Sequence, residues 1–285
     1  MEPQNELNTG TEQQSFVSPI AEPSVLRPAL IAPVWHTVVL ILAIFAISFI
    51  GVYRHPAGQN PAAVNRLRTY AVTAVLEFVL IGWVAFGLRL RGISLGSLWG
   101  RASNSFRSIA LDAGIAILFW MLSLMMLGTI AIFWLSIDNL IHHRPIVVTS
   151  SRNGKSIAPD PSQEKAARAV VQLAPTNGKE IAGWLLLCIL VGVAEELVFR
   201  GYLQQQFTAW SRGAAAGGVV FSAIMFGSAH GYEGVRAMFL LVVFGALFSL
   251  LALFRRNLRA GIFAHSWHDA FAGLTVAFLH ARHIL

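Results

Sequence analysis

Residues 181–203 read IAGWLLLCILVGVAEELVFRGYL, an apolar run that ends in two adjacent glutamates and an arginine. A helix needs about 20 mainly apolar residues to cross the hydrocarbon core of a bilayer. The part from 181 to 199 has about this length, as expected of a spanning helix. It therefore predicts a membrane-spanning helix that carries ionisable side chains near one end.

Apolar runs of similar character recur on both sides of this stretch, and the composition agrees with a membrane location. Hydrophobic residues make up 55% of the chain and charged residues only 12%, whereas soluble domains carry about a quarter charged residues. Since only helices and closed barrels satisfy their backbone in lipid, we expect an all-α fold, a polytopic transmembrane helix bundle of about seven spans. The other predicted spans are 35–53, 70–88, 109–137, 217–231, 237–254 and 258–279.

Polar segments divide the chain into four predicted parts. Residues 1–34 are rich in Glu, Gln, Asn, Ser and Pro, and they are expected to form a disordered tail. Residues 35–141 hold the N-terminal membrane helices, and residues 142–180 form a polar linker. Within the linker, the segment that starts at Asp160 has the cap and first-turn proline of a short surface helix. Residues 181–285 form the second membrane domain, where the ionisable residues concentrate.

The net charge of +7 comes from basic residues in short clusters between apolar runs. This distribution favours a membrane surface over a nucleic acid as the partner. Counting Lys and Arg in the short loops predicts a cytoplasmic N-terminus in a bacterial inner membrane or an equivalent one. The six basic residues of the linker oppose this orientation. With a single cysteine, Cys188, the chain can form neither an intramolecular disulfide nor a cysteine-based zinc site.

The second half holds ionisable residues that a purely structural bundle would rarely carry. Placing one charge at the bilayer centre costs about 2.5 to 3.5 kcal/mol on insertion scales, so each is a functional candidate. Residues four apart on a helix meet, so one Glu-Arg pair and one His-Asp pair each share a helix face. The residues are Glu195, Glu196, Arg200, His230, His265, His268 and Asp269.

Helix geometry predicts that four of these side chains converge. Glu196 is expected to pair with Arg200, which leaves Glu195, about a quarter turn away, free to face another helix. Glu195 and His265 both lie roughly 10 to 12 Å below the basic face, whereas His230 lies at roughly 18 Å. Convergence therefore requires the helix before His230 to tilt or to start below the surface.

Two kinds of chemistry are open to such a cluster, and both hydrolyse an amide. In one, Glu195, His230, His265 and Asp269 bind a metal ion such as zinc, with one position left for water. In the other, Glu195 is the general base on a water that His230 also positions, while His265 and Asp269 donate hydrogen bonds to the oxyanion. His268 is expected to be a helix-packing hydrogen bonder instead.

Three short motifs in this order resemble the CPBP family, which includes CAAX prenyl endopeptidases of the Ras-converting type and lysostaphin-resistance-like proteins. The first is Glu195-Glu196-x-x-x-Arg200, and the second is Phe-x-x-x-His, ending at His230. The third is His265 followed four positions on by Asp269, where the family has Asn. The resemblance covers about a third of the chain, roughly 181–279.

The resemblance implies an intramembrane endopeptidase acting on a membrane-associated peptide or protein, such as a prenylated CAAX-type peptide. It implies that Glu195 and His230 activate water, that His265 and residue 269 stabilise the oxyanion, and that Glu196 and Arg200 support the site. An ionised Asp269 cannot donate a hydrogen bond. This residue is therefore protonated, orients His265 or coordinates a metal.

Two other functions fit the same sequence. A non-catalytic immunity or scaffold protein would keep the fold and use the polar cluster only for packing. A proton-coupled transporter would use Glu77, in the run 70–88, as an additional relay group. Otherwise Glu77 is expected to be paired within the bundle or to lie close to an interface.

Overall fold

The computed structural model describes residues 29–54, 65–101, 103–141 and 171–282. Within these ranges the chain is helical, apart from loops and an isolated β-bridge between Gly100 and Asn257. The predicted all-α, polytopic bundle is confirmed. Most of the polar tail, and the start of the surface helix at Asp160, lie outside the described residues.

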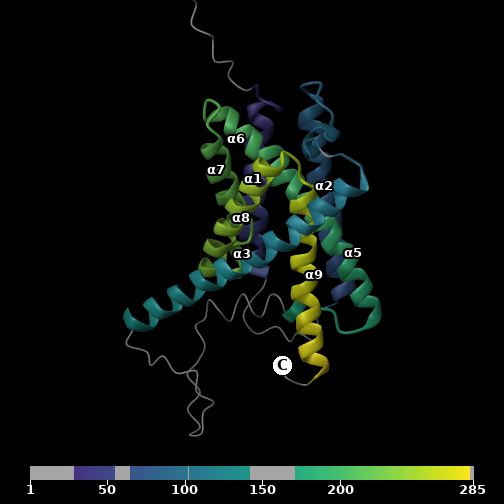
Figure 1. The fold of residues 1–285 in the computed structure, drawn as a ribbon, viewed down its shortest axis with the longest axis vertical. Helices are drawn as coiled ribbons and strands as arrows, with labels where there is room; N and C mark the ends of the chain where they lie inside the picture. The colour runs from purple at the N-terminus through teal and green to yellow at the C-terminus, as the bar shows by residue number, and fades with distance from the viewer. Residues whose placement is uncertain (1–28, 55–64, 102, 142–170, 283–285) are drawn as a thin grey trace, which may run out of the picture.

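Each of the seven predicted apolar runs coincides with a helix (Figure 1). The first half contains α1 (Val34–Arg54), α2 (Arg66–Arg89) and α3 (Phe106–Ile141), with the short η2 (Leu95–Trp99) between the last two. The second half contains α5 (Gly178–Glu195), η3 (Glu196–Leu203), α6 (Gln204–Trp210), α7 (Ala215–Ala229), η4 (Gly231–Glu233), α8 (Val235–Arg255) and α9 (Arg259–Ala281).

Five of these helices are long and apolar enough to cross a membrane: α1, α2, α3, the continuous Gly178–Trp210 and α8. The helix α7 is apolar but has only 15 residues. The helix α9 has 23 residues, and the histidines and the aspartate along it lower its hydropathy. The helix α9 carries His265 and Asp269, and His230 directly follows α7.

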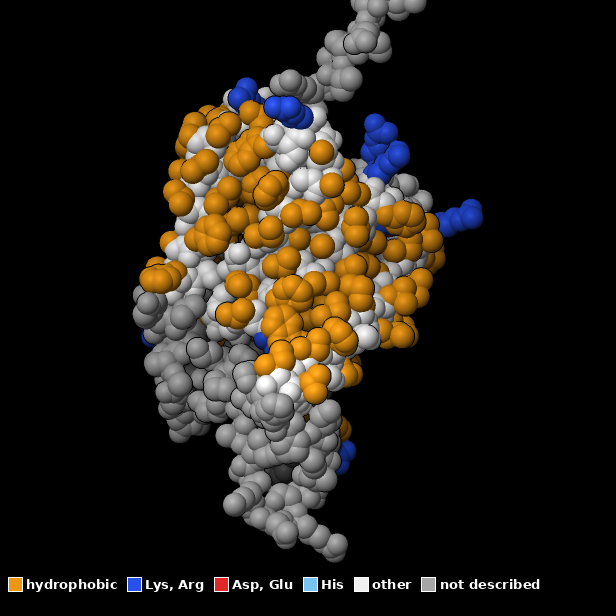
Figure 2. Space-filling model, turned by 90° about the vertical axis from the view of Figure 1, so that its left-hand side faces the viewer, with side chains coloured by type: hydrophobic (Ala, Val, Ile, Leu, Met, Phe, Trp, Pro, Cys, Tyr) orange, Lys and Arg blue, Asp and Glu red, His pale blue; other side chains and the backbone are white. Residues whose placement is uncertain are grey.

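Large apolar side chains cover much of the outer surface, as expected of a protein that faces lipid. Leu186, Met125 and Phe254 are 71%, 68% and 76% exposed. Figure 2 shows such side chains spread over one face of the bundle, with Lys and Arg gathered near one end. This distribution fits hydrocarbon contact along the body and a basic rim at one membrane surface.

Small residues let α5 and α9 pack closely, side by side in Figure 1. A Cβ at Gly192 would lie 2.3 Å from Ser266 Oγ, and one at Gly273 would lie 2.3 Å from Trp184 Nε1. Close approach at small residues is a common way for membrane helices to associate. The contact fixes the position of the end of α5 relative to α9. The helix α2 packs on the same α5.

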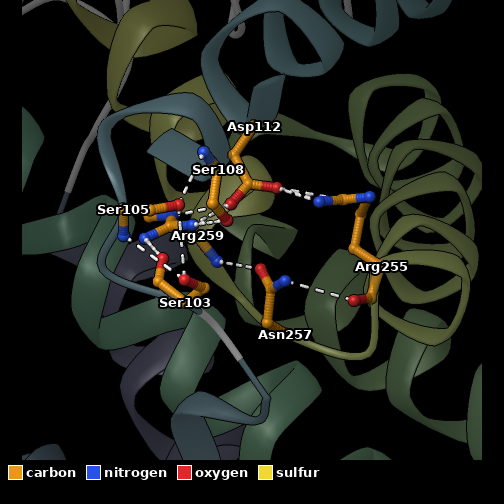
Figure 3. A network of polar contacts seen from close by, with 7 residues as sticks. All are labelled: Ser103, Ser105, Ser108, Asp112, Arg255, Asn257 and Arg259. Carbon is orange, nitrogen blue, oxygen red and sulfur yellow. Dashed lines mark hydrogen bonds and ion pairs between the residues drawn. The ribbon is translucent and has the colours of Figure 1, made fainter. Parts of the chain in front are cut away.

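Two basic loops meet at one end of the bundle. Arg101 N donates to Arg256 O at 3.0 Å, next to the Gly100–Asn257 bridge. The fully buried Asp112 of α3 accepts from Arg255 Nη2 and from Arg259 Nε, both at 2.6 Å (Figure 3). The loop after η2 and the loop between α8 and α9 therefore lie on the same side of the membrane.

Candidate active site

The two glutamates lie where an ordinary helix changes into a π-helical segment. The segment η3 covers Glu196–Leu203, and all eight of its residues are buried. Wider π turns inside α-helices occur frequently at functional sites. The apolar pattern predicted a regular helix here, because hydropathy does not distinguish one helical hydrogen-bond register from another.

Glu196 is the centre of a fully buried ion-pair network. Its Oε1 lies 3.0 Å from Arg200 Nη1, and both side chains are 0% exposed. The same oxygen lies 3.2 Å from His265 Nδ1. Because a carboxylate in an ion pair accepts, Nδ1 carries the proton and donates. Glu196, rather than Asp269, therefore holds the His265 ring through Nδ1.

Aromatic rings and a glycine complete the walls around this network. The Arg200 guanidinium lies over the Phe226 ring at 4.3 Å and over the Phe248 ring at 5.0 Å, which are favourable cation–π distances. A Cβ at Gly261 would lie 2.8 Å from Glu196 Oε2. Only glycine leaves room there for the carboxylate.

The other ring nitrogen of His265 faces two further carboxylates. His265 Nε2 lies 3.5 Å from Glu195 Oε2 and 3.8 Å from Asp269 Oδ2. Glu195 Oε2 is buried and accepts no hydrogen bond. Its side chain is 15% exposed and that of Asp269 is 26% exposed. The structure thus brings Glu195, His265 and Asp269 together, with a carboxylate oxygen free to act on a bound molecule.

His230 lies at the edge of this cluster. It follows the last residue of α7, and its Nδ1–H donates to Phe226 O at 2.9 Å. It interacts electrostatically with Asp269. Among the described residues, no hydrogen bond or ion pair joins it to Glu195, His265 or Asp269. Since Nδ1 is a donor here, Nε2 of the neutral ring is an acceptor.

His268 points away from the cluster, toward α3 and α8. Its Nδ1 accepts from Trp120 Nε1 at 3.3 Å, and its ring lies 5.0 Å from that of Phe244. These contacts fit the predicted packing role.

Two acidic residues near the site were not predicted to belong to it. Glu77 of α2 is 7% exposed and interacts electrostatically with Glu195, His265 and Asp269. Glu233 of η4 interacts electrostatically with Glu195, and burial raises its pKa above the usual range. An ionisable residue in the run 70–88 was the available signal for Glu77.

The predicted zinc alternative does not fit the arrangement of the side chains. Over the part of the chain that the structure describes, no group of three or more His, Cys, Asp or Glu residues is placed to hold a metal ion. Within the described ranges, no hydrogen bond or ion pair joins His230 to the other three candidate ligands.

The fold and the site together define the class of this protein. It is a polytopic helical membrane protein with carboxylates and imidazoles buried between its helices. Residues 177–271 match the family model for type II CAAX prenyl endopeptidase Rce1-like proteins. The match confirms the resemblance predicted from the three motifs, contains all four predicted site residues, and supports a protease. Searches of the curated proteins and of the solved structures gave no match.

Proposed function

We propose that this protein is an intramembrane endopeptidase that hydrolyses a peptide bond in a membrane-associated peptide or protein, with a water activated by Glu195. The observation that carries the proposal is the environment of Glu195 Oε2, which is buried, accepts no hydrogen bond and lies 3.5 Å from His265 Nε2. A prenylated CAAX-type peptide is the substrate class that the matched family model suggests.

In the proposed reaction, Glu195 removes a proton from a water whose other hydrogen is held by His230 Nε2. The hydroxide attacks the carbonyl carbon, and the C=O bond becomes an oxyanion on a tetrahedral carbon. Glu195 then passes its proton to the amide nitrogen, the C–N bond breaks, and a carboxylic acid and an amine leave. Glu195 acts first as base and then as acid, so no external proton is required.

His265 is the proposed oxyanion donor. Because its Nδ1–H already points at Glu196, Nε2 can donate only when the ring is an imidazolium. Glu196 on one side and Asp269 on the other supply countercharge to that cation. In this scheme Asp269 stabilises the imidazolium and makes no hydrogen bond to the oxyanion. The scheme therefore works with Asp at the position where the family has Asn. Arg200 keeps Glu196 in place.

The decisive variant is Glu195→Gln in the full-length protein, reconstituted in detergent micelles with a quenched fluorescent peptide that carries a lipid anchor. We expect kcat/KM to fall by about 100-fold or more, because the amide cannot take a proton from water. Glu180→Gln is the matched control, since this residue caps the start of α5 through Thr176 and Asn177, far from the site.

Undiminished cleavage by Glu195→Gln would remove the proposed mechanism. Thermal unfolding of both variants separates chemistry from folding. The scaffold alternative predicts a lower unfolding temperature with the biological phenotype intact, whereas the protease predicts lost cleavage at nearly unchanged stability. Comparing prenylated and unprenylated peptides then tests the substrate class.

A further inference from the structure

Helix α2 brings to the site a carboxylate that the proposed reaction does not use. Glu77 is only 7% exposed, and its Oε2 has no hydrogen-bond partner. Its electrostatic interactions are with Glu195, His265 and Asp269. It lies outside the segment 177–271, so the family-matched part of the chain does not supply it. An ionisable group kept at such a position without a partner points to an occupant.

The charges around Glu77 indicate the sign of that occupant. Glu195 Oε2 and Asp269 Oδ2 lie 3.5 Å and 3.8 Å from the same His265 nitrogen, Nε2, and Glu233 interacts electrostatically with both residues. Arg200 is already paired with Glu196. Within the described residues, no Lys or Arg forms an ion pair with Glu77, Glu195 or Asp269. A cation bound among these acidic groups would stabilise their ionised forms, because a nearby opposite charge favours the charged form of a carboxyl group.

A metal ion is one kind of cation, but the described side chains do not converge on one. A Lys or Arg side chain does not need several ligands around it, because a single ammonium or guanidinium can pair with one carboxylate. Its long, flexible side chain can reach that carboxylate from a bound peptide. A basic substrate side chain is therefore the occupant that the arrangement fits best.

We propose that Glu77 is a specificity-determining residue that binds a Lys or Arg side chain of the substrate beside the scissile bond. This inference rests on the proposed peptidase function and adds a charge requirement to it. A peptide that carries a basic residue near the cleaved bond places its cation among the carboxylates. A peptide with an acidic residue at that position meets like charge.

The test uses quenched fluorescent peptides with one lipid anchor that differ only in having Lys, norleucine or Glu at a single position. The position is scanned on each side of the cleaved bond. At one position we expect the wild-type protein to favour Lys over norleucine by about tenfold in kcat/KM, and Glu to be the poorest. In Glu77→Gln the Lys-to-norleucine ratio should fall to about 1, whereas Glu180→Gln should keep the wild-type ratio.

The ratio is internal to each variant, so a general loss of stability or activity lowers both rates and leaves it unchanged. An unaltered ratio in Glu77→Gln, or no preference for Lys at any position in the wild type, would overturn the inference.

Binding separates this inference from the proposed reaction. Fluorescence anisotropy with Glu195→Gln, alone and combined with Glu77→Gln, measures the Kd of the same peptides without cleavage. Tighter binding of the Lys peptide that disappears in the double variant supports the role of Glu77 even if no cleavage occurs. Equal Kd values for Lys and norleucine peptides in Glu195→Gln would refute it.

Discussion

Glu196 has more direct contacts than any other carboxylate of the cluster, although the proposed chemistry belongs to Glu195. It binds Arg200 and His265 through one oxygen, while the other oxygen lies against the backbone of α9 at Gly261. A carboxylate held from three sides fixes the imidazole ring that faces Glu195. The spacing of residues along one helix predicted the Glu196–Arg200 pair, but the His265 contact depends on how two helices pack.

Replacing Gly261 with Ala tests how tightly that carboxylate must be held. The added Cβ would lie 2.8 Å from Glu196 Oε2 and 3.3 Å from its Cδ, so the carboxylate must move. We expect a loss of about 1 to 3 kcal/mol in unfolding free energy and a fall in kcat of about tenfold as His265 loses its orientation. Thermal unfolding and peptide cleavage in detergent measure the two effects.

Gly82→Ala in α2 is the matched control, since nothing lies within 4 Å of its Cβ position. This change should be neutral or stabilise the helix by up to about 1 kcal/mol. If Gly261→Ala behaved like Gly82→Ala, Glu196 would have the freedom to reposition, and its role in orienting His265 would be wrong.

How much of the site could be predicted differs from residue to residue. Ionisable residues in apolar runs are conspicuous, so Glu195, His265 and Asp269 could be selected from the sequence and their shared faces inferred from helical spacing. Glu77 was equally visible, but its neighbours depend on which face of α2 packs against α5. Spacing within one helix carries no information about that face. The position of His230 at the edge of the cluster reflects the same dependence on packing.

At the level of elements, hydropathy predicted where the helices lie better than it predicted their internal form. All seven apolar runs are helices because a backbone in lipid must satisfy its own hydrogen bonds. The π-helical turn η3 was not predictable, since hydropathy does not distinguish one helical hydrogen-bond register from another. The contact of Glu196 in η3 with His265 in α9 therefore could not be predicted from the sequence and is known only from the three-dimensional structure.

Asp112 of helix α3 forms ion pairs with the last residue of α8 and the first residue of α9. Asp112 is 0% exposed and bridges Arg255 and Arg259, and Arg259 Nη2 also donates to Ser108 Oγ at 2.8 Å (Figure 3). Asp112→Asn would leave two arginine side chains partly buried without their countercharge. We expect a loss of about 3 kcal/mol in unfolding free energy, measured by thermal unfolding in detergent.

Asp138→Asn provides the comparison on the same helix. Asp138 pairs with Arg236 at 3.9 Å and is 22% exposed, so its loss should cost less than about 1 kcal/mol. Equal losses for the two variants would contradict the view that Asp112 is the main ionic attachment of α3.

At the scale of the whole molecule, the basic loops predict the orientation of the protein in the membrane. The loop that contains Arg101 is hydrogen-bonded to the loop that contains Arg256, so their positive charges add at one surface. The start of α5 lies at the other end, since Tyr70, near the start of α2, donates to Leu173 O. Lys and Arg in short loops favour the cytoplasmic side, which predicts a cytoplasmic end at Arg91 and an opposite end at Lys179.

Cysteine labelling in intact cells measures this orientation. Cys188 is the single cysteine of the sequence and is buried, so Cys188→Ala gives a background in which Arg91→Cys and Lys179→Cys can be compared. A maleimide that does not cross the membrane should label Lys179→Cys in intact cells, and Arg91→Cys only after the cells are permeabilised. The reverse pattern would contradict the orientation predicted from Lys and Arg in the short loops. It would also place the Asp112 cluster, and the end of the bundle that carries the basic loops, outside the cytoplasm.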